Sequence, residues 1–165
     1  QFDSETFNKI LSVDLVGAFY YARECGRQML EKGSGSIVNI CSIMASGGNE
    51  NNIIGYTAAK GGIVSLTRSL AAGLSPQGVR VNALAPSFVT TPHQMEFLNI
   101  PEERAKIQAM HVMAIPNAED IAEFAVFLAS DKARCVTGSV FPVDSGYTAV
   151  KAGMWLKDSL APELG

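Results

Sequence analysis

Residues 79–87 read Val-Arg-Val-Asn-Ala-Leu-Ala-Pro-Ser, and the prediction of the fold starts from this stretch. Its first six residues form a short apolar run typical of a buried strand, and Pro86, which has no N–H for a sheet, is expected to stop it. The residues on both sides have helical patterns. A strand between helices predicts right-handed crossovers and therefore a parallel sheet with helices on both faces.

The rest of the chain continues this alternation. Helices are predicted where apolar residues recur every three or four positions, and strands where a short apolar run lies between turn residues. The first helix has Asp3 or Ser4 as its N-cap and ends at Gly33, and a capping box at residues 117–120 begins the last helix. The predicted elements are, in order, a helix from residue 7 to the stop at 33–35, a strand at 36–41, a helix at 56–74, a strand at 79–84, a helix at 102–113, a helix with its apolar stripe at 121–128, and a strand at 139–143.

Composition excludes several classes of function. The chain has 165 residues, is 47% hydrophobic and carries a net charge of -3 without a basic run, so we expect one domain spanning residues 1–165 and no nucleic-acid partner. No apolar run is long enough for a membrane span. Cys25, Cys41 and Cys135 lack metal-ligand spacing and are expected to be reduced, packed thiols of a cytoplasmic protein. With only His93 and His111 as imidazoles, no metal site is expected.

Candidate catalytic residues follow the first strand. Ligands of parallel sheets bind at the carboxyl ends of the strands, where Ser42 lies. Tyr56 and Lys60 begin the next helix, four residues apart and hence on one face. A phenol, with a pKa of about 10, is a poor base, but a nearby ammonium lowers that pKa. Tyr56 is therefore predicted to be a general acid/base, with Ser42 hydrogen-bonded to the same substrate oxygen.

A second pair of the same spacing occurs near the end of the chain. Tyr147 and Lys151 follow the last predicted strand, but no serine at the end of that strand precedes them. The surrounding residues favour a helix only weakly. We expect Tyr147 to be a packing residue and Lys151 to be solvated.

Together these motifs resemble the C-terminal two-thirds of a short-chain dehydrogenase/reductase. The resemblance rests on Ser42, on Tyr56-xxx-Lys60, on residues 79–87, on Thr91 and on the stretch 127–146. It implies a Rossmann-type, three-layer α/β fold, and hydride transfer between NAD or NADP and a small-molecule alcohol or carbonyl substrate.

The resemblance also implies roles for individual residues. Tyr56 would be the acid/base, Ser42 would orient the substrate, and Lys60 would bind the nicotinamide ribose while lowering the pKa of Tyr56. The residues implied to lie on the nicotinamide side are Pro86, Ser87, Val89 and Thr91. Family members associate through the first two helices, so a homodimer or homotetramer is expected.

Some features depart from the family pattern. The Gly-rich phosphate loop would lie upstream of residue 1, so the sequence is expected to be part of a longer enzyme. Asp14 stands where an asparagine of the proton relay is usual, which predicts an altered pH dependence. Ser87 and Ser145 stand where glycine is more familiar, and the interval from Ser42 to Tyr56 is one residue longer than usual. These departures leave open an alternative, a non-catalytic relative or oligomerisation module that has lost dinucleotide binding.

The sequence says little about substrate. The segment from residue 88 to 116 is apolar and methionine-rich, which is typical of ordinary packing or of a lid over an apolar ligand. It favours a hydrophobic alcohol or ketone. The choice between NAD and NADP stays open.

Overall fold

A parallel sheet of three strands, in the order β1-β2-β3, lies between two layers of helices. The computed structural model describes residues 3–47 and 53–150. The helices are α1 (Ser4–Leu11), α2 (Gly17–Lys32), α3 (Ile54–Leu74), α4 (Pro92–Leu98), α5 (Pro101–Ala109) and α6 (Ala118–Ala129), and the strands are β1 (Gly35–Ile40), β2 (Val79–Pro86) and β3 (Val140–Val143). A π-helical segment, η1 (Ser12–Val16), joins α1 to α2, and 3₁₀ turns form η2 (Ile43–Ser46), η3 (Ser75–Gln77) and η4 (Asp131–Ala133).

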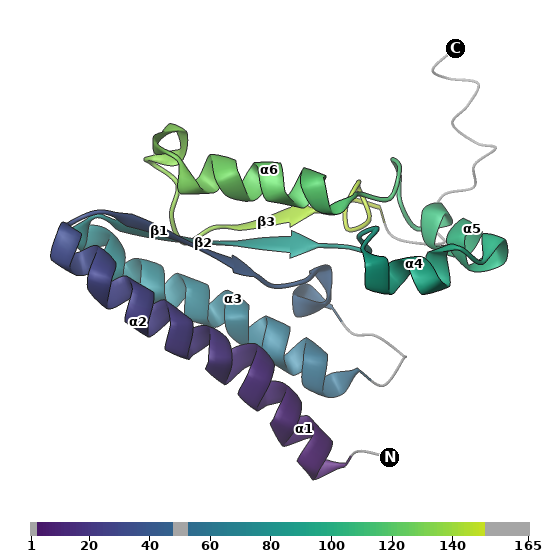
Figure 1. The fold of residues 1–165 in the computed structure, drawn as a ribbon, viewed down its shortest axis with the longest axis horizontal. Coiled ribbons are helices and arrows are strands. Elements are labelled where there is room, and N and C mark those ends of the chain that lie inside the picture. The colour runs from purple at the N-terminus through teal and green to yellow at the C-terminus, as the bar shows by residue number, and fades with distance from the viewer. Residues whose placement is uncertain (1–2, 48–52, 151–165) are drawn as a thin grey trace.

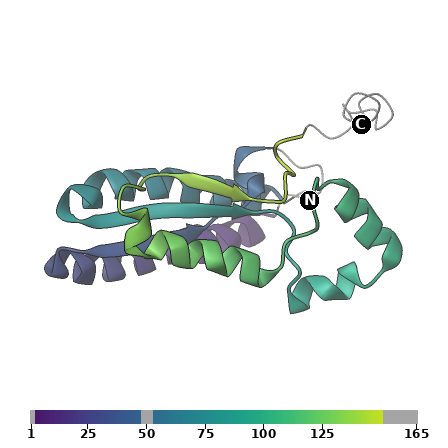
Figure 2. The ribbon, with the colours of Figure 1, turned by 90° about the horizontal axis from the view of Figure 1, so that it is seen from above.

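The two faces of the sheet carry different helices. In Figure 1, α2 and α3 cover one face and α6 covers the other. Helices α4 and α5 lie beyond the arrowhead of β2, as the second view also shows (Figure 2). Ile37 of β1 pairs with Val81 of β2, and Ala83 pairs with Val140 of β3, all in parallel register. The predicted three-layer α/β fold is confirmed.

Strand β2 supplies core residues to both faces. Side chains alternate along a strand, so Ala83 and Ala85 face α3 and pack in one cluster with Ile63. Leu84 points the other way and packs with Leu128 of α6. The alanines bring α3 close to the sheet, which places the start of α3 near the ends of the strands.

A buried amide fixes the connection that leads into β3. Asn82 is fully buried, and its Nδ2 donates a hydrogen bond to the Val136 carbonyl at 2.9 Å. Its Oδ1 accepts a hydrogen bond from the Ser139 N–H at 3.2 Å. Both polar ends of the side chain are therefore satisfied, as a buried amide requires.

The structure corrects the prediction for residues 88–116. The helix predicted at 102–113 ends at Ala109, and α4 was not predicted. The N–H groups of Val112 and Met113 donate instead to the Ser145 carbonyl, at 2.9 and 3.1 Å, so tertiary hydrogen bonds replace the last helical turn. Strand β2 also runs two residues past the predicted end, because Pro86 still pairs with Val143.

The cysteine prediction is only partly right. All three thiols are free, but Cys41 alone is buried, whereas Cys25 and Cys135 are exposed. Within residues 3–47 and 53–150, none of the helices combines the length and the apolar character needed to cross a membrane.

Candidate active site

Ser42 lies two residues after the end of β1, at the carboxyl end of the sheet. It is 7% exposed and caps η2, since its Oγ accepts a hydrogen bond from the Met44 N–H at 3.1 Å. A hydroxyl that accepts this bond keeps its own proton to donate. Ser42 is thus held by the local backbone and still has a donor for a substrate oxygen.

Tyr56 and Lys60 lie on one face of the first two turns of α3. The Lys60 Nζ is 5.4 Å from the centroid of the Tyr56 ring and donates a hydrogen bond to the Ile40 carbonyl at 3.4 Å. Ile40 is the last residue of β1, two positions before Ser42. The structure therefore brings the predicted phenol and ammonium to the strand end that carries the serine.

Asp14 lies within the π-helical segment η1, where the Gly17 N–H bonds to the Ser12 carbonyl five residues back. Such π-turns occur often at functional sites. The Asp14 side chain is half-buried, so its carboxylate carries a smaller burial penalty than a fully buried carboxylate would. A Cβ added to Gly62 of α3 would lie 2.6 Å from the neighbouring Leu15, so this glycine permits the close approach of η1 to α3.

The residues implied on the nicotinamide side follow β2 in a tight turn. Pro86 ends the strand, and the Thr91 N–H donates to the Val89 carbonyl at 2.8 Å. The Thr91 hydroxyl caps α4 by accepting from the Gln94 N–H at 3.3 Å. This turn lies next to Ser42 in the sheet, because the Cys41 N–H bonds to the Leu84 carbonyl at 2.8 Å.

Ser87 has a partner that the sequence did not predict. Its Oγ is 2.8 Å from Nε2 of His111, a buried residue just past α5. The ring of Tyr147 packs edge-on against His111, with centroids 5.2 Å apart, which is the packing role expected for that tyrosine. Lys151 lies outside the described residues.

The thiol beside Ser42 is not a competing nucleophile. Burial raises the pKa of the Cys41 thiol, and its Sγ donates to the Leu84 carbonyl at 3.1 Å. A protonated thiol is a weak nucleophile. Among the residues that the structure describes, the Ser42 hydroxyl, the Tyr56 phenol and the Lys60 ammonium are the groups available for chemistry at this strand end.

Comparisons with known proteins identify the family to which the chain belongs. A family model described as enoyl-(acyl carrier protein) reductase matches residues 1–148. The chain is 38% identical over 152 residues to cis-4-hydroxycyclohexanecarboxylate dehydrogenase of Sinomonas cyclohexanicum, covering 91% of this chain and 59% of that protein. It is 39% identical over 151 residues to inactive 2-(S)-hydroxypropyl-CoM dehydrogenase 2 of Xanthobacter autotrophicus (strain ATCC BAA-1158 / Py2), covering 88% of this chain and 65% of that protein.

A solved structure shares the fold as well. The chain superposes on 4-hydroxyisoleucine dehydrogenase complexed with NADH with a TM-score of 0.85 and 30% identity, covering 90% of this chain and 62% of the other. The parallel sheet with helices on both faces is the α/β fold that this solved structure shares. The chain belongs to the short-chain dehydrogenase/reductase family. It spans about three-fifths of the length of the curated relatives it matches.

Proposed function

We propose that the complete protein containing this chain is an NAD(P)-dependent oxidoreductase that interconverts an alcohol and a ketone or aldehyde. The observation that carries the proposal is the position of Lys60. Its ammonium lies 5.4 Å from the Tyr56 ring and 3.4 Å from the carbonyl at the end of β1, so a cation, a phenol and Ser42 share one strand end.

The chain's own residues would handle the proton. The Tyr56 hydroxyl gives a proton to the substrate oxygen during reduction and takes it back during oxidation. Ser42 donates a hydrogen bond to the same oxygen and stabilises the charge that develops there. The Lys60 ammonium stabilises negative charge on the Tyr56 oxygen.

The donor set also fits a nicotinamide nucleotide. Among the described residues, the Ile40 carbonyl is the hydrogen-bond partner of Lys60, so two of the three N–H groups of its ammonium remain for the hydroxyls of a ribose. The turn at Pro86, Ser87, Val89 and Thr91 would hold the nicotinamide. When bound, the nucleotide supplies or accepts the hydride.

The decisive experiment compares two tyrosine variants of the complete protein. Tyr56→Phe should lower kcat by about 10²–10⁴-fold, the usual contribution of a general acid/base. Tyr147→Phe keeps the ring that packs on His111 and should retain most of the activity. The assay follows absorbance of the reduced nucleotide with secondary alcohols or with the matching ketones. Equal losses in both variants, or a loss in Tyr147→Phe alone, would overturn the assignment.

A non-catalytic relative is the second candidate. Asp14 replaces the usual asparagine, and a relative at 39% identity is named as an inactive dehydrogenase. Titration of the complete protein with reduced nucleotide, followed by fluorescence, separates the candidates. Nucleotide binding without turnover of any alcohol or ketone would favour a relative that binds but does not react, and absence of both would favour an oligomerisation module.

The substrate class is proposed to be a hydrophobic alcohol or ketone. Helices α4 and α5 lie beyond the ends of the strands (Figure 2). Five apolar side chains are exposed on α4, between the two helices, and after α5. They are Phe97, Ile100, Met110, Val112 and Met113. Such a surface suits an apolar substrate. A lower KM for cyclohexanol than for a polyol of equal carbon number would support this class, and the reverse order would contradict it.

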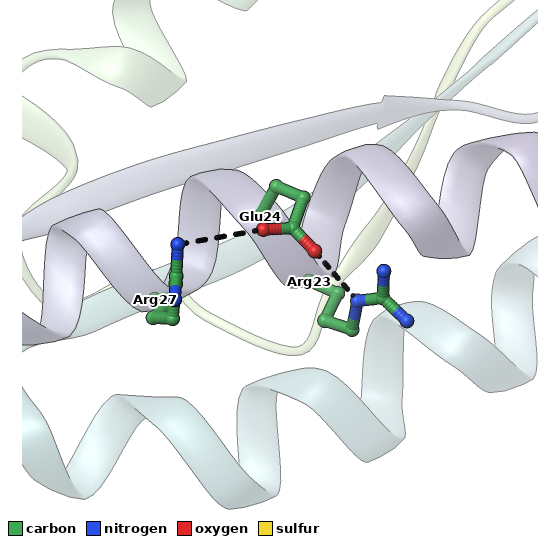
Figure 3. Close-up of polar contacts among 3 residues, drawn as sticks. All are labelled: Arg23, Glu24 and Arg27. Carbon is green, nitrogen blue, oxygen red and sulfur yellow. Dashed lines mark hydrogen bonds and ion pairs between the residues drawn. The ribbon is translucent and has the colours of Figure 1, made fainter.

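We also propose that α2 forms a contact between copies in a homodimer or homotetramer. Tyr21 is 78% exposed, and Tyr20 is 52% exposed. The Arg23 guanidinium lies 5.2 Å from the centroid of the Tyr20 ring. Arg23 and Arg27 both pair with Glu24, as Figure 3 shows. Exposed ion pairs add little stability, so the aromatic rings would supply most of the contact. Tyr21→Glu should lower the sedimentation mass of the complete protein, whereas a monomeric wild type would contradict the proposal.

A further inference from the structure

His111 joins the α4–α5 segment to the strand end through two short contacts. Its Nδ1 is 2.7 Å from the Ile107 carbonyl oxygen, and its Nε2 is 2.8 Å from the Ser87 Oγ. The residue is 7% exposed, and its ring packs against Tyr147 and Phe88, with centroids 5.2 and 6.5 Å away. The imidazole is therefore fixed by two aromatic contacts and by a hydrogen bond at each ring nitrogen.

These contacts determine which nitrogen carries the proton in the neutral ring. A carbonyl oxygen can only accept, so Nδ1 must be the nitrogen that donates to Ile107. Nε2 is then the acceptor, and the Ser87 hydroxyl must donate to it. The hydroxyl has one proton, and its other possible acceptor, the Phe88 carbonyl, is more distant at 3.4 Å. The Ser87 proton is thus directed at His111.

Backbone contacts keep the imidazole in place. The two residues after it, Val112 and Met113, bond to the Ser145 carbonyl at 2.9 and 3.1 Å. Ser145 has a left-handed backbone with φ 49°, a conformation unfavourable for a residue with a Cβ. The carbonyl that receives both N–H groups belongs to this residue, so the backbone directly after His111 is fixed to the start of the segment that follows β3.

Ser87 occupies the middle of the candidate site. It follows the last residue of β2, and β2 lies between β1, which leads to Ser42, and β3, which leads to Asp144. With its proton directed at His111, the Ser87 oxygen can only accept a hydrogen bond from a ligand at this edge. A glycine at this position would offer no such oxygen.

We propose that His111 is a positioning residue that holds Ser87 as a hydrogen-bond acceptor for an N–H donor of the bound nucleotide, the class of group present in the nicotinamide carboxamide. This inference rests on the proposed function, since it concerns the same nucleotide. His111 itself acts through Ser87. The hydrogen-bond chain runs from the Ile107 carbonyl through both ring nitrogens to the Ser87 oxygen.

The first test needs no activity. In the complete protein without nucleotide, at about pH 8, where a free imidazole is neutral, ¹⁵N NMR of the histidine side chains should show His111 protonated on Nδ1 and bare on Nε2. His111→Gln assigns the signal by its loss. A proton on Nε2 with a bare Nδ1 would overturn the proposal, whether or not the protein turns over substrate.

The second test is a double-mutant cycle on nucleotide affinity. His111→Phe keeps a ring against Tyr147 and removes the acceptor, and Ser87→Ala removes the hydroxyl. Each should raise the Kd for NADH or NADPH about three- to tenfold, the value of one hydrogen bond, and the double variant should be no weaker than the worse single variant. His111→Gln, which keeps an amide donor and acceptor, should recover most of the affinity.

The outcomes separate this proposal from the proposed function. Unchanged affinity in Ser87→Ala, or effects of the two variants that multiply, would overturn the role of His111 while nucleotide binding stands. A wild-type protein that binds neither NADH nor NADPH would overturn the proposed function and the acceptor role together. If His111→Phe fails to fold, His111→Gln and Ser87→Ala are compared with the wild type. His111→Gln should then keep a Kd close to that of the wild type, whereas Ser87→Ala should raise it.

Discussion

Replacing Asn82 with alanine is expected to destabilise the fold by about 1–3 kcal/mol. The side chain is fully buried in the central strand and makes two hydrogen bonds, to the Val136 carbonyl at 2.9 Å and from the Ser139 N–H at 3.2 Å. Each such bond contributes about 0.5–1.5 kcal/mol net, and both partners would lose it together. The change should loosen the connection that leads into β3.

Urea unfolding of the complete protein measures this effect. With a slope of about 2 kcal/mol per molar, the midpoint for Asn82→Ala should fall by about 1 M. Asn8→Ala, on the exposed face of α1, is the matched control and should change stability by less than about 0.5 kcal/mol. A loss below about 1 kcal/mol in Asn82→Ala would mean that water replaces the amide at no great cost, and the reasoning would be refuted.

Three further predictions concern other parts of the chain. Burial raises the pKa of the Cys41 thiol, so the thiol stays protonated at neutral pH. Mass spectrometry after brief iodoacetamide treatment should show the two exposed cysteines alkylated and Cys41 unmodified. In the complete protein Asp14→Asn should change the pH–rate profile while activity is retained, and an unchanged profile would contradict a role for Asp14 in the proton relay. Gly78→Ala should lower the free energy of unfolding by more than Gly33→Ala. Both glycines have positive φ, but only a Cβ on Gly78 would overlap the backbone, at the carbonyl of Gly33. Equal losses of unfolding free energy would exclude the overlap.

The sequence predicted those elements whose signals are local. The capping box from Asn117 to Asp120 is present, with both reciprocal hydrogen bonds at 2.8 Å. Asp3 caps α1, and Gly33 ends α2 with a left-handed φ of 69°. Capping depends on residues within one turn of each other, so the pattern can be recognised without the fold.

The missed features depend on distant residues. The helix predicted to reach Met113 stops at Ala109 because the Ser145 carbonyl, more than thirty residues later, takes the N–H groups of residues 112 and 113. The contact of His111 with Ser87 spans 24 residues and has no signature in either neighbourhood. Likewise, Ser42, Tyr56 and Lys60 could be predicted to share an edge from topology, but the hydrogen bond of Lys60 to Ile40 could not.

The π-helical segment Ser12–Val16 adds one residue to a single turn between α1 and α2, since the Gly17 N–H bonds five residues back instead of four. An α-helix advances about 100° for each residue, so deleting one residue from this segment would restore regular winding and rotate α1 by about that angle relative to α2. Residues of α1 that contact α3, such as Ile10 beside Gly55, would then face elsewhere. The segment therefore sets the alignment of two helical faces, and homologues that lack it should show a one-residue gap here together with a shifted apolar pattern in α1.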